Sequence, residues 1–251
     1  MAKIIAVLNH KGGVGKTTTT INLASALRQK KKRVLAIDMD GQANLTESCG
    51  ISIEEEQTVY GAMRGEYPLP IVELENGLAV VPSCLDLSAA ESELINEPGR
   101  ELILKGLIAR LLDSRKFDYI LIDCPPSLGL LTLNALTAAE YLIIPVQAQF
   151  LAMRGMAKIT NVIEIVKERL NPNLNIGGIV ITQFDKRKTL NKSVAELIND
   201  SFCDKVFKTV IRDNVALAEA PIKGKNIFEY NKNSNGAKDY MALAQEVLKL
   251  K

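Results

Sequence analysis

The 251-residue sequence predicts a single α/β domain with a mostly parallel, twisted sheet and helices on both of its faces. Short, uninterrupted apolar runs, which are typical of strands buried on both faces, alternate with helical patterns along the chain. Strands joined by helices in this way imply right-handed crossover connections in a parallel sheet. The chain contains no linker-like, repetitive or low-complexity tract, so we expect residues 1–251 to form one domain.

Each element is placed by its own pattern of apolar residues. We expect strands over 3–8, 33–38, 78–81, 119–122, 141–146, 178–181 and 206–211. We expect helices over about 17–30, 87–96, 100–113, 129–139, 152–170, 189–202 and 237–250. The last helix carries an apolar stripe that includes Tyr240, Ala244 and Val247. Segment 50–76, with acidic residues at 54–56 and two prolines, is the least regular, and we expect it to be a surface excursion.

Charge is unevenly distributed along the chain. Residues 1–150 carry 14 Lys/Arg and 18 Asp/Glu, a net charge of −4, whereas residues 151–251 carry 17 and 11, a net charge of +6. The C-terminal part is therefore suited to contact with a polyanion, although a solvated, lysine-rich surface explains the same distribution.

Several classes of protein are not expected from this composition. The sequence has neither a basic leader followed by an apolar run nor about 18 uninterrupted apolar residues, so we expect neither secretion nor membrane spanning. Its four cysteines show no C-x-x-C spacing, and His10 is its one histidine, so we expect no zinc site. We interpret the cysteines as reduced residues of a cytosolic protein.

A phosphate-binding loop is predicted where the first strand ends. Residues 10–18, with the sequence HKGGVGKTT, follow a buried strand and open a helix, which is the setting that such a loop requires. The glycines let successive backbone N–H groups turn toward phosphate oxygens, and the helix dipole adds to the attraction. Lys16 is expected to reach the β- and γ-phosphates, and the Thr17 hydroxyl to bind Mg²⁺. We expect the triphosphate to contact Lys11, Gly12, Gly13, Val14, Gly15, Lys16, Thr17 and Thr18.

Acidic residues follow two other predicted strands. Asp38 and Asp40 close the strand over 33–38, and Asp123 ends the buried run that begins at Tyr119. Since the carboxyl ends of parallel strands converge on one crevice, these carboxylates should meet the phosphate loop there. Several carboxylates beside a phosphate site require a cation, so the sequence predicts Mg²⁺ together with the nucleotide.

These segments carry a family resemblance. The string KGGVGKTT resembles the deviant Walker A box of the ParA/MinD/nitrogenase iron-protein superfamily, with His10 where the strict P-loop pattern has glycine. Residues 38–46 are similar to the D-x-D-x-Q-x-N-L-T stretch of ParA/Soj proteins, and segments 123–129 and 214–221 strengthen the match. The resemblance extends from residue 3 to about 250, and it implies a P-loop NTPase fold.

The resemblance also implies a function. ParA/Soj proteins are DNA-partitioning ATPases that form an ATP–Mg²⁺ sandwich dimer, bind DNA without sequence preference, and are released when a ParB-like centromere-binding partner stimulates hydrolysis. The resemblance places the protein in the cytoplasm, on the nucleoid and not on a membrane. By the same resemblance, Lys11 reaches the phosphates of the partner subunit's ATP, Asp40 positions or deprotonates the attacking water, and Asp38 and Asp123 belong to the magnesium shell. Asn214 matches a position near the adenine base, although a helix N-cap role explains it equally well.

The expected DNA contacts lie in the basic C-terminal part. Arg187 is found where Soj-like proteins carry a DNA-binding arginine, whereas Ala216 stands where a second arginine is usual. That departure either weakens DNA binding or transfers the contacts to neighbouring lysines, and a solvated side chain is the alternative for Arg187. The expected contacts are Arg187, Lys188, Lys192, Lys223 and Lys225. Because the phosphate loop begins at residue 11, we expect no N-terminal helix-turn-helix domain and no sequence-specific operator binding.

Three other functions share some of these motifs. A MinD-like regulator of division-site placement would need a basic amphipathic membrane-binding tail, which the final helix matches poorly. An electron-transfer protein like the nitrogenase iron protein would need two cluster-binding cysteines, for which Cys84 and Cys124 are the candidates. A non-catalytic, ATP-gated DNA-binding scaffold would share every binding motif and differ only in turnover.

Overall fold

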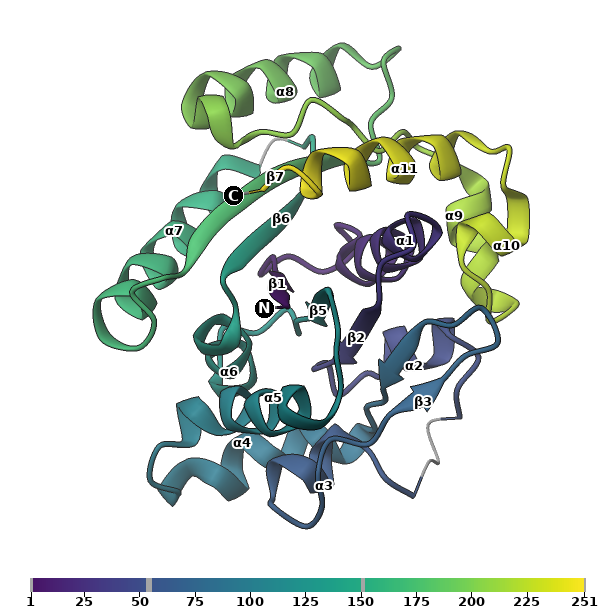
Figure 1. The fold of residues 1–251 in the computed structure, drawn as a ribbon. Helices are drawn as coiled ribbons and strands as arrows, with labels where there is room; N and C mark the ends of the chain where they lie inside the picture. The colour runs from purple at the N-terminus through teal and green to yellow at the C-terminus, as the bar shows by residue number, and fades with distance from the viewer. Residues whose placement is uncertain (1, 53–55, 150–151, 251) are drawn as a thin grey trace.

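The computed structural model describes residues 2–52, 56–149 and 152–250 (Figure 1). Within these ranges, seven strands form one sheet in the order β3-β4-β2-β5-β1-β6-β7. All neighbouring strands are parallel except the edge pair β3 and β4, which is antiparallel. The strands are β1 Lys3–Val7, β2 Val34–Asp38, β3 Val72–Glu73, β4 Ala79–Val81, β5 Tyr119–Asp123, β6 Tyr141–Gln147 and β7 Asn175–Thr182.

Helices of very different length connect these strands. The α-helices are α1 Lys16–Gln29, α2 Asn44–Ser48, α3 Val59–Met63, α4 Ala90–Glu93, α5 Ile103–Ser114, α6 Leu130–Ala138, α7 Ala152–Arg169, α8 Thr189–Phe202, α9 Val215–Ile222, α10 Ile227–Asn231 and α11 Asn235–Val247. Short 3₁₀ helices are η1 Leu85–Ala89, η2 Leu94–Asn96, η3 Arg100–Leu102 and η4 Cys203–Lys205.

The sheet separates two apolar layers, as the sequence predicts. On one face, α1 and α11 lie side by side and pack against strand residues such as Val7 and Ala36 (Figure 1). On the other face, α3, α5, α6, α7 and α8 pack against alternate residues of the same strands, such as Ala6 and Ile37. The predicted fold class, a mostly parallel sheet with helices on both faces, is confirmed.

The order of the strands determines where a ligand site can form. The β1 strand lies between β5 and β6; the chain runs from β1 to β2 on one side of the sheet and from β6 to β7 on the other, so these two connections turn in opposite directions. A crevice opens at such a switch point, at the carboxyl ends of the strands. The loop after β1, which carries the phosphate-loop sequence, therefore lies at the position that α/β folds use for ligands.

The predicted strand over 206–211 is wrong. The structure has only isolated bridges there, from Ile179 to Val206 and from Phe184 to Arg212. The reason is a side chain from the last helix: the Glu246 carboxylate accepts 2.9 Å hydrogen bonds from the backbone N–H groups of residues 208 and 209. At the centre of this segment, the backbone N–H groups are thus bonded to a carboxylate and not to the carbonyl groups of a neighbouring strand.

Segment 50–76 is also more ordered than we expected. Residues 53–55, and with them two of the three consecutive glutamates, lie outside the described residues. Later in the segment, α3 buries Val59 and Ala62 in the main core, and β3 forms an edge strand. The predicted helix over 87–96 is divided into η1, α4 and η2.

The sequence missed α2, α9 and α10, because five to eight residues are too few for a helical period to show.

Candidate phosphate and magnesium site

The loop between β1 and α1 turns at two glycines. Gly13 and Gly15 have φ angles of +75° and +88°, in the left-handed region that residues with a Cβ rarely adopt. The 14-residue helix α1 begins at Lys16, so its unpaired N–H groups and the positive end of its dipole face this loop. The Val14 side chain is buried, so Val14 has only its backbone to offer a ligand. The loop has the backbone conformation of an anion-binding site.

The first turn of α1 contacts the end of β5. Thr17 Oγ1 donates a 2.6 Å hydrogen bond to Asp123 Oδ2, and Thr20 Oγ1 donates a 3.1 Å hydrogen bond to Asp123 Oδ1. Lys16 is buried beside them, 8% exposed, and its charge acts on Asp123. The structure thus brings together Lys16, Thr17 and Asp123, which the sequence had placed in two separate motifs. No sequence motif indicated Thr20, which lies one helical turn after Lys16.

Asp38 and Asp123 are both fully enclosed by the protein. Burial raises the pKa of each carboxyl group well above its ordinary range, and repulsion from Asp40 raises the pKa of Asp38 further, as repulsion from Asp38 raises that of Asp123. Hydrogen bonds from Thr17 and Thr46 oppose these shifts. Buried carboxylates of this kind favour a nearby cation, which would offset both desolvation and repulsion.

The donor set fits Mg²⁺. Magnesium is held by one or two carboxylates together with phosphate oxygens and water, and the Thr17 hydroxyl and Asp123 carboxylate are ligands of that type. In the parts of the chain that the structure describes, no group of three or more His, Cys, Asp or Glu side chains is arranged to hold a metal. A magnesium ion held by Thr17 and Asp123 would complete its coordination with phosphate oxygens and water.

Asp38 belongs to a closed ring of hydrogen bonds. Its Oδ2 accepts from the backbone N and the Oγ1 of Thr46 at 2.9 and 2.7 Å, and its Oδ1 accepts from the backbone N of Asp40 at 3.1 Å. Ser83 closes the ring, because its N donates to Thr46 Oγ1 at 2.9 Å and its Oγ donates to the Asp40 carbonyl at 2.8 Å. Three acceptor positions of the Asp38 carboxylate are occupied, so Asp38 holds the loop 40–46 in place and has little capacity left for a direct metal bond.

The side chain of Asp40 lies outside this ring. It is 9% exposed, and its Oδ1 accepts a 3.0 Å hydrogen bond from the backbone N of Gln42. Asp40 therefore stabilises a turn through Oδ1, as aspartate commonly does. Its Oδ2 accepts no hydrogen bond from the described residues. The sequence did not indicate Ser83 and Thr46 as supporting residues, although Thr46 ends the motif that carries the family resemblance.

The Lys11 side chain is partly exposed and is hydrogen-bonded to another residue of its own chain. Its Nζ donates a 2.5 Å hydrogen bond to Oε1 of Gln149, which follows β6. Its backbone N donates to Oδ1 of Asn9 at 3.1 Å, and Asn9 is anchored by a 2.7 Å bond from Nδ2 to the Pro145 carbonyl. Lys11 thus points toward the end of β6, whereas Lys16 is buried beside Asp123.

A pocket of about 280 Å³ adjoins the phosphate loop and contains the predicted adenine-site residue. It is lined by residues that include Gly15, Thr18, Asp213, Asn214 and Tyr240. Asn214 Oδ1 accepts a 2.9 Å hydrogen bond from the backbone N of the residue at position 216, so it caps α9. The N-cap interpretation is therefore confirmed, and the same residue lines a pocket together with Gly15 and Thr18 of the loop.

The expected DNA-contact residues form two groups at opposite ends of α9. Arg187 lies in the turn before α8, beside Val215 at the start of α9, and Lys188 and Lys192 are exposed next to it. Lys223 and Lys225 are exposed after the end of α9, where they line a different pocket.

Arg187 is exposed but paired. Its guanidinium makes two 3.0 Å hydrogen bonds to the carboxylate of Asp185, and these bonds lower the pKa of Asp185 to about 2. The ion pair is at the surface, with the Arg187 side chain 86% exposed. The positive charge of Arg187 is thus partly neutralised by its own turn.

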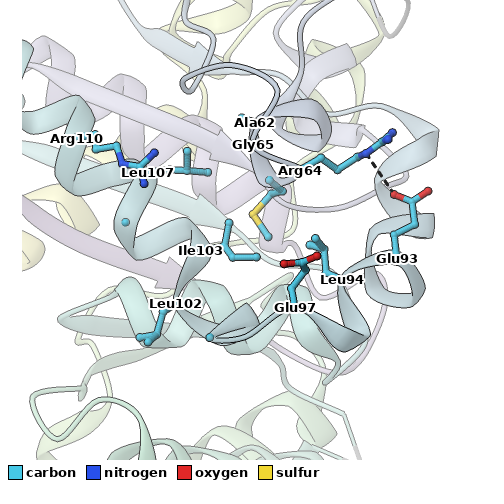
Figure 2. Close-up of a pocket in the computed structure, with 13 residues that line it drawn as sticks. Ala62, Arg64, Gly65, Glu93, Leu94, Glu97, Leu102, Ile103, Leu107 and Arg110 are labelled. Atoms are coloured by element: carbon cyan, nitrogen blue, oxygen red, sulfur yellow. Dashed lines mark ion pairs between the residues drawn. The ribbon is translucent and has the colours of Figure 1, made fainter.

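A larger pocket lies away from the phosphate loop. It measures about 740 Å³ and is lined by residues of α3, η2 and α5, with Leu94, Ile103 and Leu107 among its apolar side chains (Figure 2). At its rim, Arg64 is ion-paired with Glu93 at 3.6 Å. None of the residues that the sequence predicts for function lines this pocket.

Two of the alternative functions can be compared with the structure. Cys124 is fully buried, burial raises the pKa of its thiol, and its Sγ faces the backbone carbonyl of Ile122, which is a poor environment for a cluster ligand. The apolar stripe of α11 packs inside the protein, with Tyr240, Ala244 and Val247 buried. No helix among the described residues is long and apolar enough to cross a membrane.

Comparison with known proteins shows the family of this chain. Residues 2–176 match the family described as AAA domain. The chain is 44% identical over 252 residues to the sporulation initiation inhibitor protein Soj of Bacillus subtilis, covering 98% of each protein. It is 42% identical over 254 residues to the chromosome partitioning protein ParA of Myxococcus xanthus, covering 99% of this chain and 89% of that protein.

A solved structure shares the same fold. The cobyrinic acid a,c-diamide synthase of Mycobacterium smegmatis with bound ADP and magnesium superposes with a TM-score of 0.88 at 34% identity, covering 99% of this chain and 95% of the other. The P-loop NTPase fold is therefore confirmed, and the two relatives named above are a Soj protein and a chromosome partitioning protein ParA. This chain belongs to the ParA/Soj family of partitioning ATPases.

Proposed function

We propose that residues 1–251 act as one Mg²⁺-dependent ATPase domain that converts ATP and water to ADP and phosphate, slowly in the absence of a partner. The observation that carries this proposal is the hydrogen bond from Thr17 to Asp123 beside the buried Lys16, directly under the phosphate loop. A hydroxyl, a carboxylate and an ammonium group at a helix N-terminus are the groups that bind a magnesium–triphosphate.

Each polar residue of the site then has a defined task. The backbone N–H groups of residues 12–18 bind the phosphates, Lys16 binds the β- and γ-phosphates, and Asn214 lies beside the base. Thr17 and Asp123 hold Mg²⁺, with Asp38 acting through water; the ion neutralises charge on the phosphates when it is bound. Asp40 orients the attacking water. Since phosphoryl transfer depends mainly on positioning and charge neutralisation, such a set is chemically sufficient.

We further propose that the ATP-bound form is a homodimer. For Lys11 to reach the phosphates of the partner subunit, its Nζ must leave Gln149, and an exposed lysine–amide hydrogen bond costs little to break. Nucleotide would then hold two subunits together. The paired basic turns around Arg187 would bind double-stranded DNA by contacts to phosphate, with the affinity of each subunit reinforced by the other.

Release from DNA would follow hydrolysis. We propose that a ParB-like centromere-binding protein accelerates the reaction, which breaks the dimer and lowers DNA affinity. The protein would accordingly be found in the cytoplasm and on the nucleoid. The family membership supports this cycle, as does the basic C-terminal half of the chain.

One experiment tests nucleotide binding, dimerisation and turnover together. Purified protein is mixed with Mg²⁺-ATP, Mg²⁺-ADP or neither, its mass is followed by light scattering, and phosphate release is measured in parallel. We expect a dimer with ATP alone and a slow release of phosphate. If calorimetry shows no binding of either nucleotide, the proposed function is wrong. If ATP binds and a dimer forms but phosphate is never released, the protein is a non-catalytic ATP-gated scaffold.

A further inference from the structure

The carboxyl end of β7 is bound directly to the phosphate loop. Thr182 Oγ1 donates a 2.8 Å hydrogen bond to the carbonyl of Val14, and Gln183 Nε2 donates a 2.7 Å hydrogen bond to the carbonyl of Gly13. Two consecutive side chains thus hold two consecutive carbonyl groups of the loop, across about 170 residues of sequence. No motif in the sequence indicates this contact.

These two bonds determine where the loop N–H groups point. In a planar trans peptide, the C=O of one residue and the N–H of the next point in opposite directions. Because the Gly13 carbonyl is held against Gln183, the N–H of Val14 points away from Gln183. Because the Val14 carbonyl is held against Thr182, the N–H of Gly15 points away from Thr182. Such N–H groups are the ones that a phosphate loop offers to its ligand.

The amide of Gln183 is oriented by a third residue. Gln147 Nε2 donates a 2.6 Å hydrogen bond to Gln183 Oε1, which leaves the Nε2 end of Gln183 for Gly13. Gln147 is itself fixed in the sheet, because it is the register partner of Thr182 at the ends of β6 and β7. A chain of side-chain contacts therefore runs from β6 through Gln183 to the loop.

The backbone of Gln183 is also unusual. Its φ angle is +51°, a conformation that side chains other than glycine seldom adopt. The next residue, Phe184, is held by a 3.0 Å hydrogen bond from its N to the Ile211 carbonyl, which fixes the chain on the far side of the strained position. Backbone strain of this kind persists where the surroundings require it, often at ligand sites. Gln183 and Thr182 also line the pocket that contains Gly15 and Thr18.

We propose that Gln183 is a positioning residue for nucleotide binding, which sets the direction of the phosphate-loop N–H groups by holding the Gly13 carbonyl. The inference rests on the proposed nucleotide function and extends it to a residue outside the loop. Gln183 acts through the backbone and needs no contact with the nucleotide.

The sharpest test is the substitution Gln183→Glu. The glutamate keeps the size of the side chain and an acceptor for Gln147, but it replaces the donor with an oxygen that faces the Gly13 carbonyl. We expect the affinity for Mg²⁺-ADP, measured by calorimetry, to fall about tenfold or more. Gln245→Glu, which makes the same change at an exposed position of α11, should leave the affinity unchanged.

A second variant separates positioning from stability. Gln183→Gly removes the amide but relieves the left-handed backbone, so we expect an unfolding temperature close to that of the wild type together with an affinity several-fold lower. In turnover assays both variants should raise KM more than they lower kcat. If either variant binds Mg²⁺-ADP as the wild type does, the inference is overturned. If the wild type itself binds no nucleotide, the proposed function fails instead.

Discussion

Asp38 and Asp123 are register partners at the last positions of two adjacent parallel strands, β2 and β5, and both are enclosed by the protein. The two carboxylates have different neighbours. Asp38 is bound by Thr46 and by the backbone of Asp40, whereas Asp123 is bound by two hydroxyls of α1. Asp38 therefore supports the loop 40–46, and Asp123 faces the phosphate loop. The pair places two buried carboxyl groups where a cation and a nucleotide would meet.

Replacing Asp123 should increase stability and abolish magnesium dependence. Asp123→Asn removes a carboxyl group whose ionised form is disfavoured by burial and by Asp38, and it still bonds to the hydroxyls of Thr17 and Thr20, which can accept as well as donate. We expect the free energy of unfolding of the nucleotide-free protein at pH 7 to rise by about 1 kcal/mol. Magnesium should no longer strengthen ATP binding. Urea unfolding and calorimetry with and without Mg²⁺ measure the two effects, and a variant with unchanged magnesium dependence would remove Asp123 from the metal site.

Lys16→Ala should abolish nucleotide binding. The ammonium group is buried beside the loop, so its interaction with phosphates is only weakly screened by solvent. We expect an affinity for Mg²⁺-ATP at least a hundredfold lower, about 2.7 kcal/mol, and no ATP-dependent dimer. Lys238→Ala on α11, where the lysine is exposed, is the matched control. Retention of tight binding by Lys16→Ala would contradict the assignment.

Asp40→Ala should stop hydrolysis without disturbing the fold. The hydrogen-bonded ring uses the backbone N and O of Asp40, so removal of the carboxylate costs only its bond to Gln42, about 1 kcal/mol. We expect ATP to bind normally, phosphate release to fall about a hundredfold or more, and the ATP dimer to persist on DNA.

Light scattering and DNA retention measure the outcome for Asp40→Ala. Thr46→Val, which breaks the ring without removing the carboxylate, should instead lower the unfolding temperature. Hydrolysis by Asp40→Ala at the wild-type rate would show that another group positions the water.

The ion pair between Asp185 and Arg187 should limit DNA binding. Asp185→Asn frees the guanidinium from a charged partner, so ATP-dependent DNA retention should extend to higher salt. Arg187→Ala should do the opposite, lowering the slope of log affinity against log salt by about one. Asp200→Asn, which makes the same charge change at the end of α8, is the control. Equal retention by all four proteins over a salt series would exclude this turn from the DNA contact.

Acid should remove the contribution that the surface ion pair between Arg33 and Asp118, at the amino ends of β2 and β5, makes to the stability of the protein. Hydrogen bonds from Arg33 lower the pKa of Asp118 to about 2. A carboxyl group with a lowered folded-state pKa stabilises the protein above its unfolded pKa of about 4, and this contribution disappears as the pH falls toward 2. Since both side chains are substantially exposed, we expect Asp118→Asn to lose only about 0.5 kcal/mol at pH 7. Urea unfolding from pH 7 to 2.5 should show the two proteins converging below pH 4.

The sequence alone determined the elements whose signals are local. The helix over 189–202 begins and ends where its pattern predicts, and the buried strand that ends at Asp123 was found to within one residue. The phosphate loop was identified because its glycines, Lys16 and Thr17 are contiguous and follow a buried strand. Such features depend on neighbours within a few residues, so the local sequence carries the necessary information.

Only the tertiary structure decided the relationships between distant segments. Glu246 of the last helix replaces a strand at 208–209, and Ser83 closes the ring around Asp38. Gln183 holds a loop that lies about 170 residues earlier in the sequence. Each contact joins a polar side chain to a backbone group that is unpaired in its own segment, and such groups must find partners once the chain is compact. Which partner is available depends on how the helices pack on the sheet, and no single segment of the sequence contains that information.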